Sequence, residues 1–179
     1  MSREVFTAGH STRSAEELVA LFAEAGVTRV VDVRRYPVSR RFPQHSRERL
    51  RGSLEAAGVG YAFLGDALGG RLEPTTPPEA SPNGAWREPS LRAFADALDT
   101  PELRAGLAAL ESLAAEQPSA VLCAERDWRS CHRQIVADAL AARGWRVMHL
   151  LRPGEREPHR LHASARIDAE GRLSYPSLV

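Results

Sequence analysis

The chain alternates between short apolar runs rich in β-branched residues and longer segments with helical periodicity, and this alternation restricts the fold more than any other feature. The strand-like runs cover residues 5–8, 28–33, 59–64, 120–123 and 145–151. Helical patterns cover residues 14–25, 46–57, 90–99, 102–116 and 130–143. Strands that alternate with helices form right-handed crossovers and a mostly parallel sheet covered on both faces. We therefore predict an α/β fold, a three-layer sandwich with a Rossmann-like, mostly parallel sheet of about five strands.

The length of the chain and the positions of its glycines and prolines predict its domain organisation. At about 150 residues per domain, 179 residues make a single domain, 1–179, with a loop or tail to spare. Residues 65–89 contain four glycines and five prolines, which predicts a long loop that is either ordered or mobile. Beyond residue 153 the pattern weakens into a C-terminal extension, 153–179, in which residues 166–175 are typical of a small hairpin.

Composition excludes several classes of protein. With 43% hydrophobic and 26% charged residues, the chain is too apolar for a disordered protein. No apolar run approaches the roughly 18 residues of a membrane helix, and the N-terminus shows no apolar signal region. Two cysteines without an export signal favour a reducing compartment. We expect a cytoplasmic protein with no membrane partner.

The charge is nearly balanced overall but uneven along the chain. A net charge of +1 excludes a globally basic nucleic-acid binder. All 24 basic residues are arginine, which we attribute mainly to codon bias, although arginine favours bidentate contact with phosphate. Residues 34–51 hold seven arginines and one acid, Glu48, a local excess of 7 − 1 = +6. This segment is either a solvated face or an anion-binding patch.

Polar and reactive side chains follow the predicted strands at the points where they end. The carboxyl ends of parallel strands share one edge of the sheet, where α/β folds bind ligands. In chain order these ends offer His10 with Ser11, Asp32 with Arg34, Gly69 with Gly70, Cys123 with Glu125, and His149 with Arg152. Their convergence predicts a functional cleft outside the carboxyl ends of the strands.

The segment 123–133 carries most of the candidate chemistry. A strand end presents Cys123 and Glu125, and a predicted helix start presents Cys131, His132 and Arg133. The N–H groups of a helix start attract negative charge and would lower the pKa of a thiol at Cys131 or nearby. Either thiol is then a candidate nucleophile, and Arg133 a candidate phosphate ligand.

Three side chains are candidate acids and bases, and two members of the whole set, Cys123 and Glu125, also have a purely structural interpretation. Glu125, His10 and His132 are candidates for acid–base catalysis. The structural alternative is that Cys123 is only a small buried apolar residue. In the same alternative Glu125 pairs with Arg34, Arg126 or Arg133 in a structural network.

A metal site and a redox pair are less favoured interpretations of the same residues. Cys123, Cys131 and His132 would form a tetrahedral zinc site with a fourth ligand from His10, His159 or His162. The spacing C-x7-C-H matches no standard zinc pattern, and a redox pair is more often C-x-x-C. We therefore predict no metal site and no cofactor, with zinc as the alternative.

A second candidate binding element follows the predicted strand at 28–33. Asp32 lies within an apolar run, and a buried carboxylate needs a partner, for which Arg34 is the nearest candidate. Ser39, Arg40 and Arg41 supply donors suited to an oxyanion, and the aromatic residues on either side, Tyr36 and Phe42, can stack on a base. The alternative is an exposed basic loop that contacts nothing. Gly69 and Gly70 allow a backbone to approach a ligand closely.

With these residues in view, the chain resembles a prokaryotic family catalogued as domain of unknown function 488. The matching features are Gly9-His10-Ser11, Val31-Asp32-Val33-Arg34, Pro37, Ser39-Arg40, Leu68-Gly69-Gly70, Cys123, Glu125, Cys131-His132-Arg133, His162, Arg166-Ile167 and Leu173-Ser174-Tyr175. The resemblance extends over nearly the whole chain. It implies a small cytoplasmic α/β domain and brings no activity with it.

The residues themselves favour a cleft that binds, and as an enzyme would process, a phosphate-bearing ligand such as a nucleotide or nucleic acid. In this hypothesis Arg34, Arg40 and Arg133 hold the anion and Asp32 orients Arg34. No Walker P-loop and no dinucleotide-binding G-x-G-x-x-G motif occurs, which disfavours ATPases and dehydrogenases. The alternative is a non-catalytic nucleic-acid-binding module with a structural Cys-Glu-Cys-His-Arg cluster. The sequence leaves the oligomeric state open.

Overall fold

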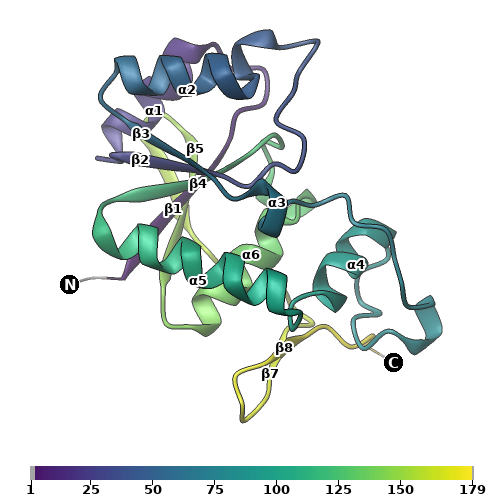
Figure 1. Ribbon diagram of the computed structural model, residues 1–179. Helices are drawn as coiled ribbons and strands as arrows, with labels where there is room; N and C mark the ends of the chain where they lie inside the picture. Colours follow the sequence, from purple (N-terminus) through teal and green to yellow (C-terminus); the bar gives the residue numbers. More distant parts are fainter. Residues whose placement is uncertain (1–2, 179) are drawn as a thin grey trace.

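The computed structural model describes residues 3–178 and has a six-stranded sheet at its centre (Figure 1). The strands are β1 (Glu4–Gly9), β2 (Arg29–Asp32), β3 (Gly60–Phe63), β4 (Ser119–Cys123), β5 (Arg146–Arg152) and β6 (Glu155–Pro158). Their order is β3-β2-β4-β1-β5-β6, with β1 to β5 parallel and β6 antiparallel to β5. The predicted α/β fold with a mostly parallel sheet is confirmed, and an antiparallel edge strand is added to it.

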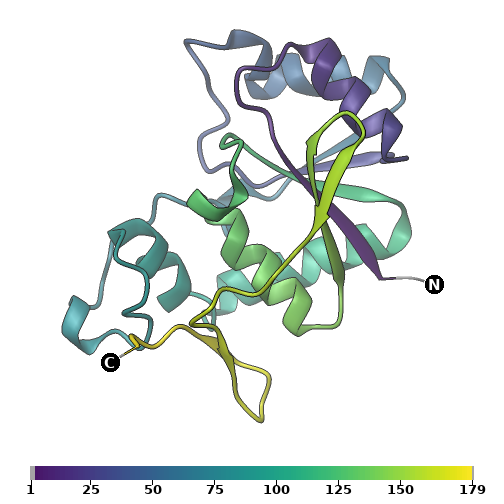
Figure 2. The ribbon, with the colours of Figure 1, turned by 180° about the vertical axis from the view of Figure 1, so that it is seen from behind.

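Helices cover both faces of the sheet and make it the middle of three layers (Figures 1 and 2). The helices are α1 (Ala15–Glu24), α2 (Arg47–Ala56), α3 (Gly65–Leu68), α4 (Pro89–Asp96), α5 (Pro101–Glu116) and α6 (Arg133–Ala142). The core on the α1–α2 side contains Val30 and Leu122, and the core on the α5–α6 side contains Val31 and Val121. Successive strand residues point to opposite faces, so continuous apolar strands fill both cores.

The connections of the sheet create a crevice between β1 and β4. The chain leaves β1 through α1 toward β2, and it leaves β4 through α6 toward β5 on the other side. Because β1 and β4 are neighbours, these connections diverge and cross opposite faces of the sheet. In open α/β sheets, such a topological switch point is where ligands bind. The topology therefore favours the carboxyl ends of β1 and β4 as the place of a site.

One helix boundary predicted from the sequence is wrong. The helix predicted over residues 130–143 begins only at Arg133, because Trp128–Ser130 form a separate 3₁₀ turn. The carboxylate of Asp127 caps that turn by accepting a hydrogen bond from the backbone N–H of Arg129 at 2.9 Å. Local capping thus interrupts the helical periodicity before α6 begins.

The segments predicted as a loop and a tail contain more regular structure than expected. Residues 65–89 include α3 and a 3₁₀ turn at Pro78–Ala80. The tail includes β6, a strand of charged residues without an apolar alternation to reveal it. The predicted C-terminal hairpin is confirmed as β7 (Arg166–Ile167) and β8 (Leu173–Ser174). None of the helices among residues 3–178 is both long and apolar enough to cross a membrane.

A buried chain of polar groups ties the C-terminal segment to α6 and the sheet. The carboxylate of Asp138 on α6 accepts hydrogen bonds from His159 Nε2 at 2.7 Å and from the Tyr175 hydroxyl at 2.7 Å. His159 Nδ1 lies 2.9 Å from His149 Nε2, and His149 Nδ1 lies 2.6 Å from the Thr7 hydroxyl. All four distances suit hydrogen bonds when both imidazoles are neutral. Burial supports that state, since it lowers the pKa of His149 to about 2.

Two buried histidines, His149 and His10, make the stability of the fold depend on pH. Burial lowers the pKa of His149 to about 2 and that of His10 to about 4, whereas the unfolded chain titrates near the ordinary value of 6.5. The unfolded state therefore binds more protons below that value, so stability falls as the pH drops. From pH 7 to pH 5 we expect each histidine to cost about 2 kcal/mol, measured by urea unfolding at both values.

The variant His149→Gln isolates one part of this effect. Glutamine offers polar groups to the same partners but does not titrate, so the pH dependence should flatten by about half. Equal loss of stability in the parent and the variant between pH 7 and pH 5 would contradict the assignment of a neutral His149.

Candidate functional site

A cleft of about 820 Å³ lies at the carboxyl ends of β1, β2 and β4. Its walls come from segments far apart in the chain, which the sheet brings to one edge. Of the residues singled out in the sequence, the lining contains His10, Arg34, Ser39, Gly70, Cys123, Glu125, Cys131 and His132. Asp32, Arg40, Gly69 and Arg133 lie outside the lining.

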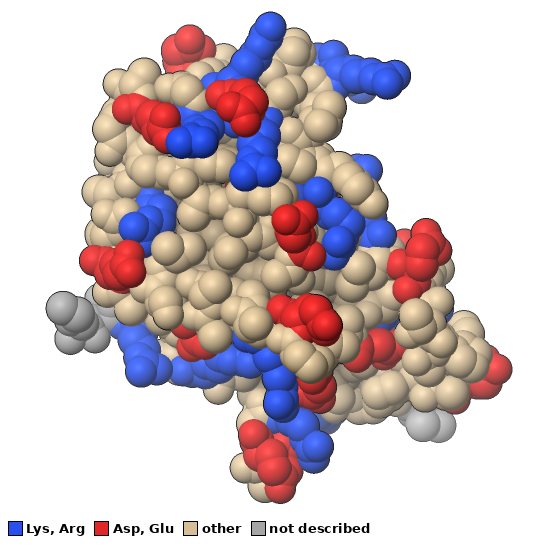
Figure 3. Space-filling model, in the orientation of Figure 1, with Lys and Arg blue, Asp and Glu red and all other residues tan. Residues whose placement is uncertain are grey.

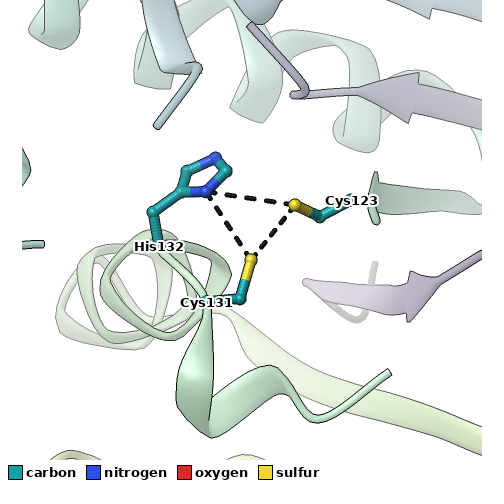
Figure 4. A group of neighbouring side chains, drawn as sticks. All are labelled: Cys123, Cys131 and His132. Carbon is teal, nitrogen blue, oxygen red and sulfur yellow. Dashed lines mark hydrogen bonds between the residues drawn. The ribbon is translucent and has the colours of Figure 1, made fainter. Parts of the chain in front are cut away.

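Two sulfurs and one imidazole nitrogen meet at the floor of the cleft (Figure 4). Cys123 Sγ lies 3.1 Å from Cys131 Sγ, and His132 Nδ1 lies 4.0 Å from the first sulfur and 3.6 Å from the second. All three side chains are buried. A disulfide requires about 2.05 Å between the sulfurs, so both cysteines are free thiols. We call these three residues the Cys–Cys–His cluster.

The surroundings fix the tautomer of His132. Its Nε2 lies 3.2 Å from the carbonyl oxygen of Val33, which follows β2. A carbonyl oxygen can only accept, so Nε2 carries the proton and Nδ1 presents a lone pair to the sulfurs. Phe94 of α4 packs edge-on against the same imidazole, at 5.2 Å between ring centroids.

The two thiols differ in their electrostatics. The hydrogen bond that Cys131 donates lowers the pKa of the Cys123 thiol, and the positive charge of Arg133 acts in the same direction. The same bond, together with burial, raises the pKa of the Cys131 thiol. The lowered pKa expected for Cys131 or a nearby thiol therefore belongs to Cys123, at the end of β4, rather than to Cys131.

Arg133 lies beneath the loop that follows β4. Its guanidinium is 1% exposed and donates from one terminal nitrogen to the carbonyl oxygens of Glu125 at 3.0 Å and Arg126 at 3.1 Å. Its Nε and its other terminal nitrogen have no hydrogen-bond partner among the described residues. This buried positive charge shapes the loop from below and favours negative charge on the adjacent sulfurs.

Two glycines allow the close approaches on which the floor depends. A methyl group on Gly70 would lie 2.7 Å from His132 Nδ1 and 2.9 Å from its Cγ, so only glycine fits over this ring. A side chain on Gly9, at the end of β1, would collide with the carbonyl oxygen of Glu125. We expected Gly70 to let the backbone approach a ligand, and in the structure it approaches His132.

The predicted ion pair between Asp32 and Arg34 is confirmed. The guanidinium binds the carboxylate in a bidentate manner, at 2.9 and 2.8 Å, with both side chains buried. Arg34 also donates to the carbonyl oxygen of His45 at 2.7 Å and lies 3.2 Å from His10 Nε2. The hydroxyl of Tyr61 donates to Asp32 at 2.6 Å. Arg34 thus anchors several segments and has little donor capacity left for a ligand.

His10 is held in a neutral state by the same network. Its Nδ1 lies 3.0 Å from the carbonyl oxygen of Ser11, so that nitrogen donates and Nε2 accepts from Arg34. Its ring stacks on that of His45 at 4.2 Å between centroids. Burial lowers the pKa of His10 to about 4, with the Arg34 charge acting in the same direction.

The rim of the cleft holds arginines with free charge. Arg41, Arg71 and Arg126 are exposed, line the cleft and form no ion pair with a carboxylate among residues 3–178. We call these three residues the arginine rim. The carboxylate of Glu125 also lines the cleft, and the pairing considered for it with Arg34, Arg126 or Arg133 does not occur among the described residues.

Sequence reasoning missed several residues of the site. Tyr61, His45 and Arg13 are buried or half-buried polar residues, and each has a partner in another segment of the chain: Asp32, Arg34 and Leu151, respectively. Arg13 donates hydrogen bonds to the carbonyl oxygens of Gly9 and Leu151 and thereby links the carboxyl ends of β1 and β5. Arg126 and Arg71 had a signal in the sequence, since Arg126 lies in the same strand-end loop as Cys123 and Glu125 and Arg71 directly follows Gly70.

Comparison with known proteins gives a family and no closer relative. The model of a family described as "Domain of unknown function DUF488" matches residues 14–140. This range contains the Asp32–Arg34 pair and the Cys–Cys–His cluster and leaves out His10 and the C-terminal hairpin. Neither curated proteins nor solved structures gave a significant match.

The Asp32–Arg34 pair generates a stability prediction. The substitution Asp32→Asn leaves the Arg34 guanidinium buried without a counter-charge, which should destabilise the fold by about 3–5 kcal/mol. Tyr61→Phe removes only one hydrogen bond to the same carboxylate and should cost about 1–3 kcal/mol. Urea unfolding at pH 7 measures both.

A double variant separates the ion pair from general damage to the site. If the pair is the cause, Asp32→Asn combined with Arg34→Gln should cost clearly less than the sum of the two single variants. Additive losses would show that the two side chains do not depend on each other.

Proposed function

The chain belongs to the DUF488 family, and we propose that its cleft binds a small phosphate-bearing molecule, with the arginine rim as the phosphate ligand. The observation that carries this proposal is the set of exposed arginines Arg41, Arg71 and Arg126, which line one cleft without carboxylate partners. A guanidinium fork matches the oxygens of a phosphate and binds them through charge-assisted hydrogen bonds.

The other cleft residues favour a nucleotide over inorganic phosphate. Tyr36 and Phe42 lie in the lining and offer rings on which a base can stack. The carboxylates of Glu125 and Asp127 offer acceptors for the hydroxyl or amino groups of a nucleoside. A volume of about 820 Å³ suits a ligand of this size.

The distribution of charge supports a local site rather than a broadly basic surface. Figure 3 shows arginines and acidic residues mixed across one face of the protein, with uncharged surface between them. The net charge of the whole chain is only +1. Attraction to a phosphate therefore depends on the few arginines of the rim, whose removal should have a large effect.

Processing of the bound ligand would use groups at the floor and wall of the cleft. The exposed carboxylate of Glu125 has no ion-pair partner among residues 3–178 and suits the role of acid or base. His10 already uses both ring nitrogens, which favours Glu125 over His10 for that role. Cys123, Cys131 and His132 are the groups that would contact the reacting atoms.

Calorimetric titration with AMP, ADP, ATP and pyrophosphate tests the proposal. We expect at least one of them to bind, and Arg126→Ala to weaken its binding by about tenfold or more, because a hydrogen bond to a charged group is lost. Arg71→Ala should act in the same direction. Arg172→Ala removes an arginine of the C-terminal hairpin, outside the cleft, and is the matched control.

Two results would contradict the proposal. One is that none of the four compounds binds at millimolar concentration. The other is that both rim variants keep the parental affinity while the protein remains folded.

Single-stranded nucleic acid is the second candidate ligand, favoured by one observation on the loop after β2. Tyr36 and Val38 are 64% and 75% exposed there, beside the exposed Arg40 and Arg41. Exposed aromatic rings next to arginines are typical of surfaces on which single-stranded bases stack. This would correspond to the non-catalytic binding module that the sequence leaves open.

Salt dependence separates the two candidates. Two phosphate contacts on a single strand predict a roughly sevenfold loss of affinity between 50 and 200 mM salt, from a slope of about −0.7 per contact. Fluorescence anisotropy with a labelled oligonucleotide measures it, and Arg40→Ala with Arg41→Ala should abolish the dependence. Unchanged binding by that double variant would rule out this loop as the contact surface.

A further inference from the structure

We propose that Cys123, Cys131 and His132 bind a divalent transition metal ion of the zinc class through two sulfurs and one nitrogen, with a fourth position open to the cleft. This inference goes beyond phosphate binding and stands on the geometry of the Cys–Cys–His cluster alone. All three ligand atoms lie within 4.8 Å of one another. They come from the end of β4 and from the segment just before α6, so the sheet and the helix hold them from two sides.

The distances in the cluster are close to those of a tetrahedral site. Bonds of about 2.3 Å to sulfur and 2.0–2.1 Å to nitrogen at tetrahedral angles place two sulfurs about 3.8 Å apart and each sulfur about 3.6 Å from the nitrogen. The observed sulfur–nitrogen distances are 4.0 and 3.6 Å, and the sulfurs are 3.1 Å apart. The main adjustment that a metal ion requires is an increase of about 0.7 Å in the distance between the two sulfurs.

The groups around the cluster are those that support metal ligands in proteins. The Val33 carbonyl accepts the Nε2 proton of His132 at 3.2 Å, which leaves Nδ1 free to bind a metal. The backbone N–H of Arg133 points at Cys131 Sγ from 3.4 Å. A methyl group on Gly70 would approach several atoms of the His132 ring at similar distances, so this glycine lies over the face of the imidazole. The lone pair of Nδ1 lies in the plane of the ring and therefore points away from Gly70.

The protein supplies three ligands and leaves the fourth position to the cleft. Of the histidines considered as a fourth ligand, His10 is bonded to Ser11 and Arg34. The imidazole of His159 and the backbone N–H of His162 are hydrogen-bonded to Asp138, away from the cluster. Three protein ligands with one open position are typical of catalytic zinc sites, whereas structural sites have four. All three members of the cluster line the cleft, so a water or a ligand oxygen can reach that position.

The donor set selects the metal and sets the charge. Sulfur and imidazole ligands suit Zn²⁺ and exclude Ca²⁺ and Mg²⁺, which require oxygen ligands. Binding releases the thiol protons to solvent, and two thiolates then neutralise the divalent ion. The positive charge of the buried Arg133 guanidinium interacts with both cysteines and favours an anionic fourth ligand at this neutral centre.

Cobalt substitution of the full-length protein tests the inference without any assumption about the ligand of the cleft. The protein is reduced, freed of metal, shown by thiol titration to hold two free thiols, and titrated with Co²⁺ alone. We expect one ion per chain, with the strong visible absorption of tetrahedral cobalt and a near-ultraviolet thiolate-to-cobalt band. Cys131→Ser should halve that band and weaken Zn²⁺ binding by at least tenfold. His132→Asn should weaken binding and keep most of the band, since both sulfurs remain.

Controls distinguish this site from adventitious binding and from damage to the fold. His162→Gln removes an imidazole outside the cluster and should bind Co²⁺ like the parent. Circular dichroism establishes that each variant is folded, and His132→Asn tests the site if Cys131→Ser is not. Absence of a stoichiometric ion in the reduced protein would overturn the inference. Unchanged Co²⁺ affinity and an unchanged thiolate-to-cobalt band after substitution of Cys123 or Cys131 would do the same, as would unchanged affinity after substitution of His132.

The outcome is separable from that of phosphate binding. A protein that binds a nucleotide through the arginine rim but no Co²⁺ refutes the metal site alone. A protein that binds Co²⁺ in the cluster but none of the phosphate compounds refutes the proposed function alone.

Discussion

The buried ion pair between Asp32 and Arg34 holds together the elements that form the cleft. A carboxylate without exposure at the end of β2 is tolerable only with a counter-charge and full hydrogen bonding. Arg34 supplies the positive charge and also donates hydrogen bonds to His45 and His10. The hydroxyl of Tyr61 on β3 donates a further hydrogen bond to the carboxylate. One interaction thereby fixes the ends of β1, β2 and β3 and the loop that rises from them.

The opposite wall depends on a second buried charge without an acidic partner. Arg133 holds the loop after β4 by its carbonyl oxygens, and Gly9 allows that loop to cross the end of β1. The positive charge of this guanidinium acts on both cysteines, and its field favours the charged form of sulfur. The arrangement keeps a positive charge in the protein core, which is costly unless negative charge lies nearby.

The sequence predicts the layers of the fold because they depend on periodicity and burial, which are local. It also predicts the partner of Asp32, since a buried carboxylate needs a nearby cation and Arg34 is two residues away. It does not predict Tyr61 or His45, whose roles arise only when distant segments meet. The start of α6 was misplaced because the Asp127 cap competes locally with helical periodicity, and only the geometry shows which prevails.

The chemistry of the Cys–Cys–His cluster also depends on contacts between distant segments, which the sequence does not predict. A spacing of C-x7-C-H matches no standard zinc pattern, so the sequence offers zinc only as the less favoured alternative; the contact between Cys123 and Cys131 depends on a turn that the spacing does not encode. The decisive feature lies just after β2, where the Val33 carbonyl fixes the proton of His132 and leaves the lone pair of Nδ1 facing the sulfurs. In the proposed arrangement the two features would act on one ligand: the arginine rim would attract its charge, and a metal ion held by the Cys–Cys–His cluster would polarise one of its oxygens.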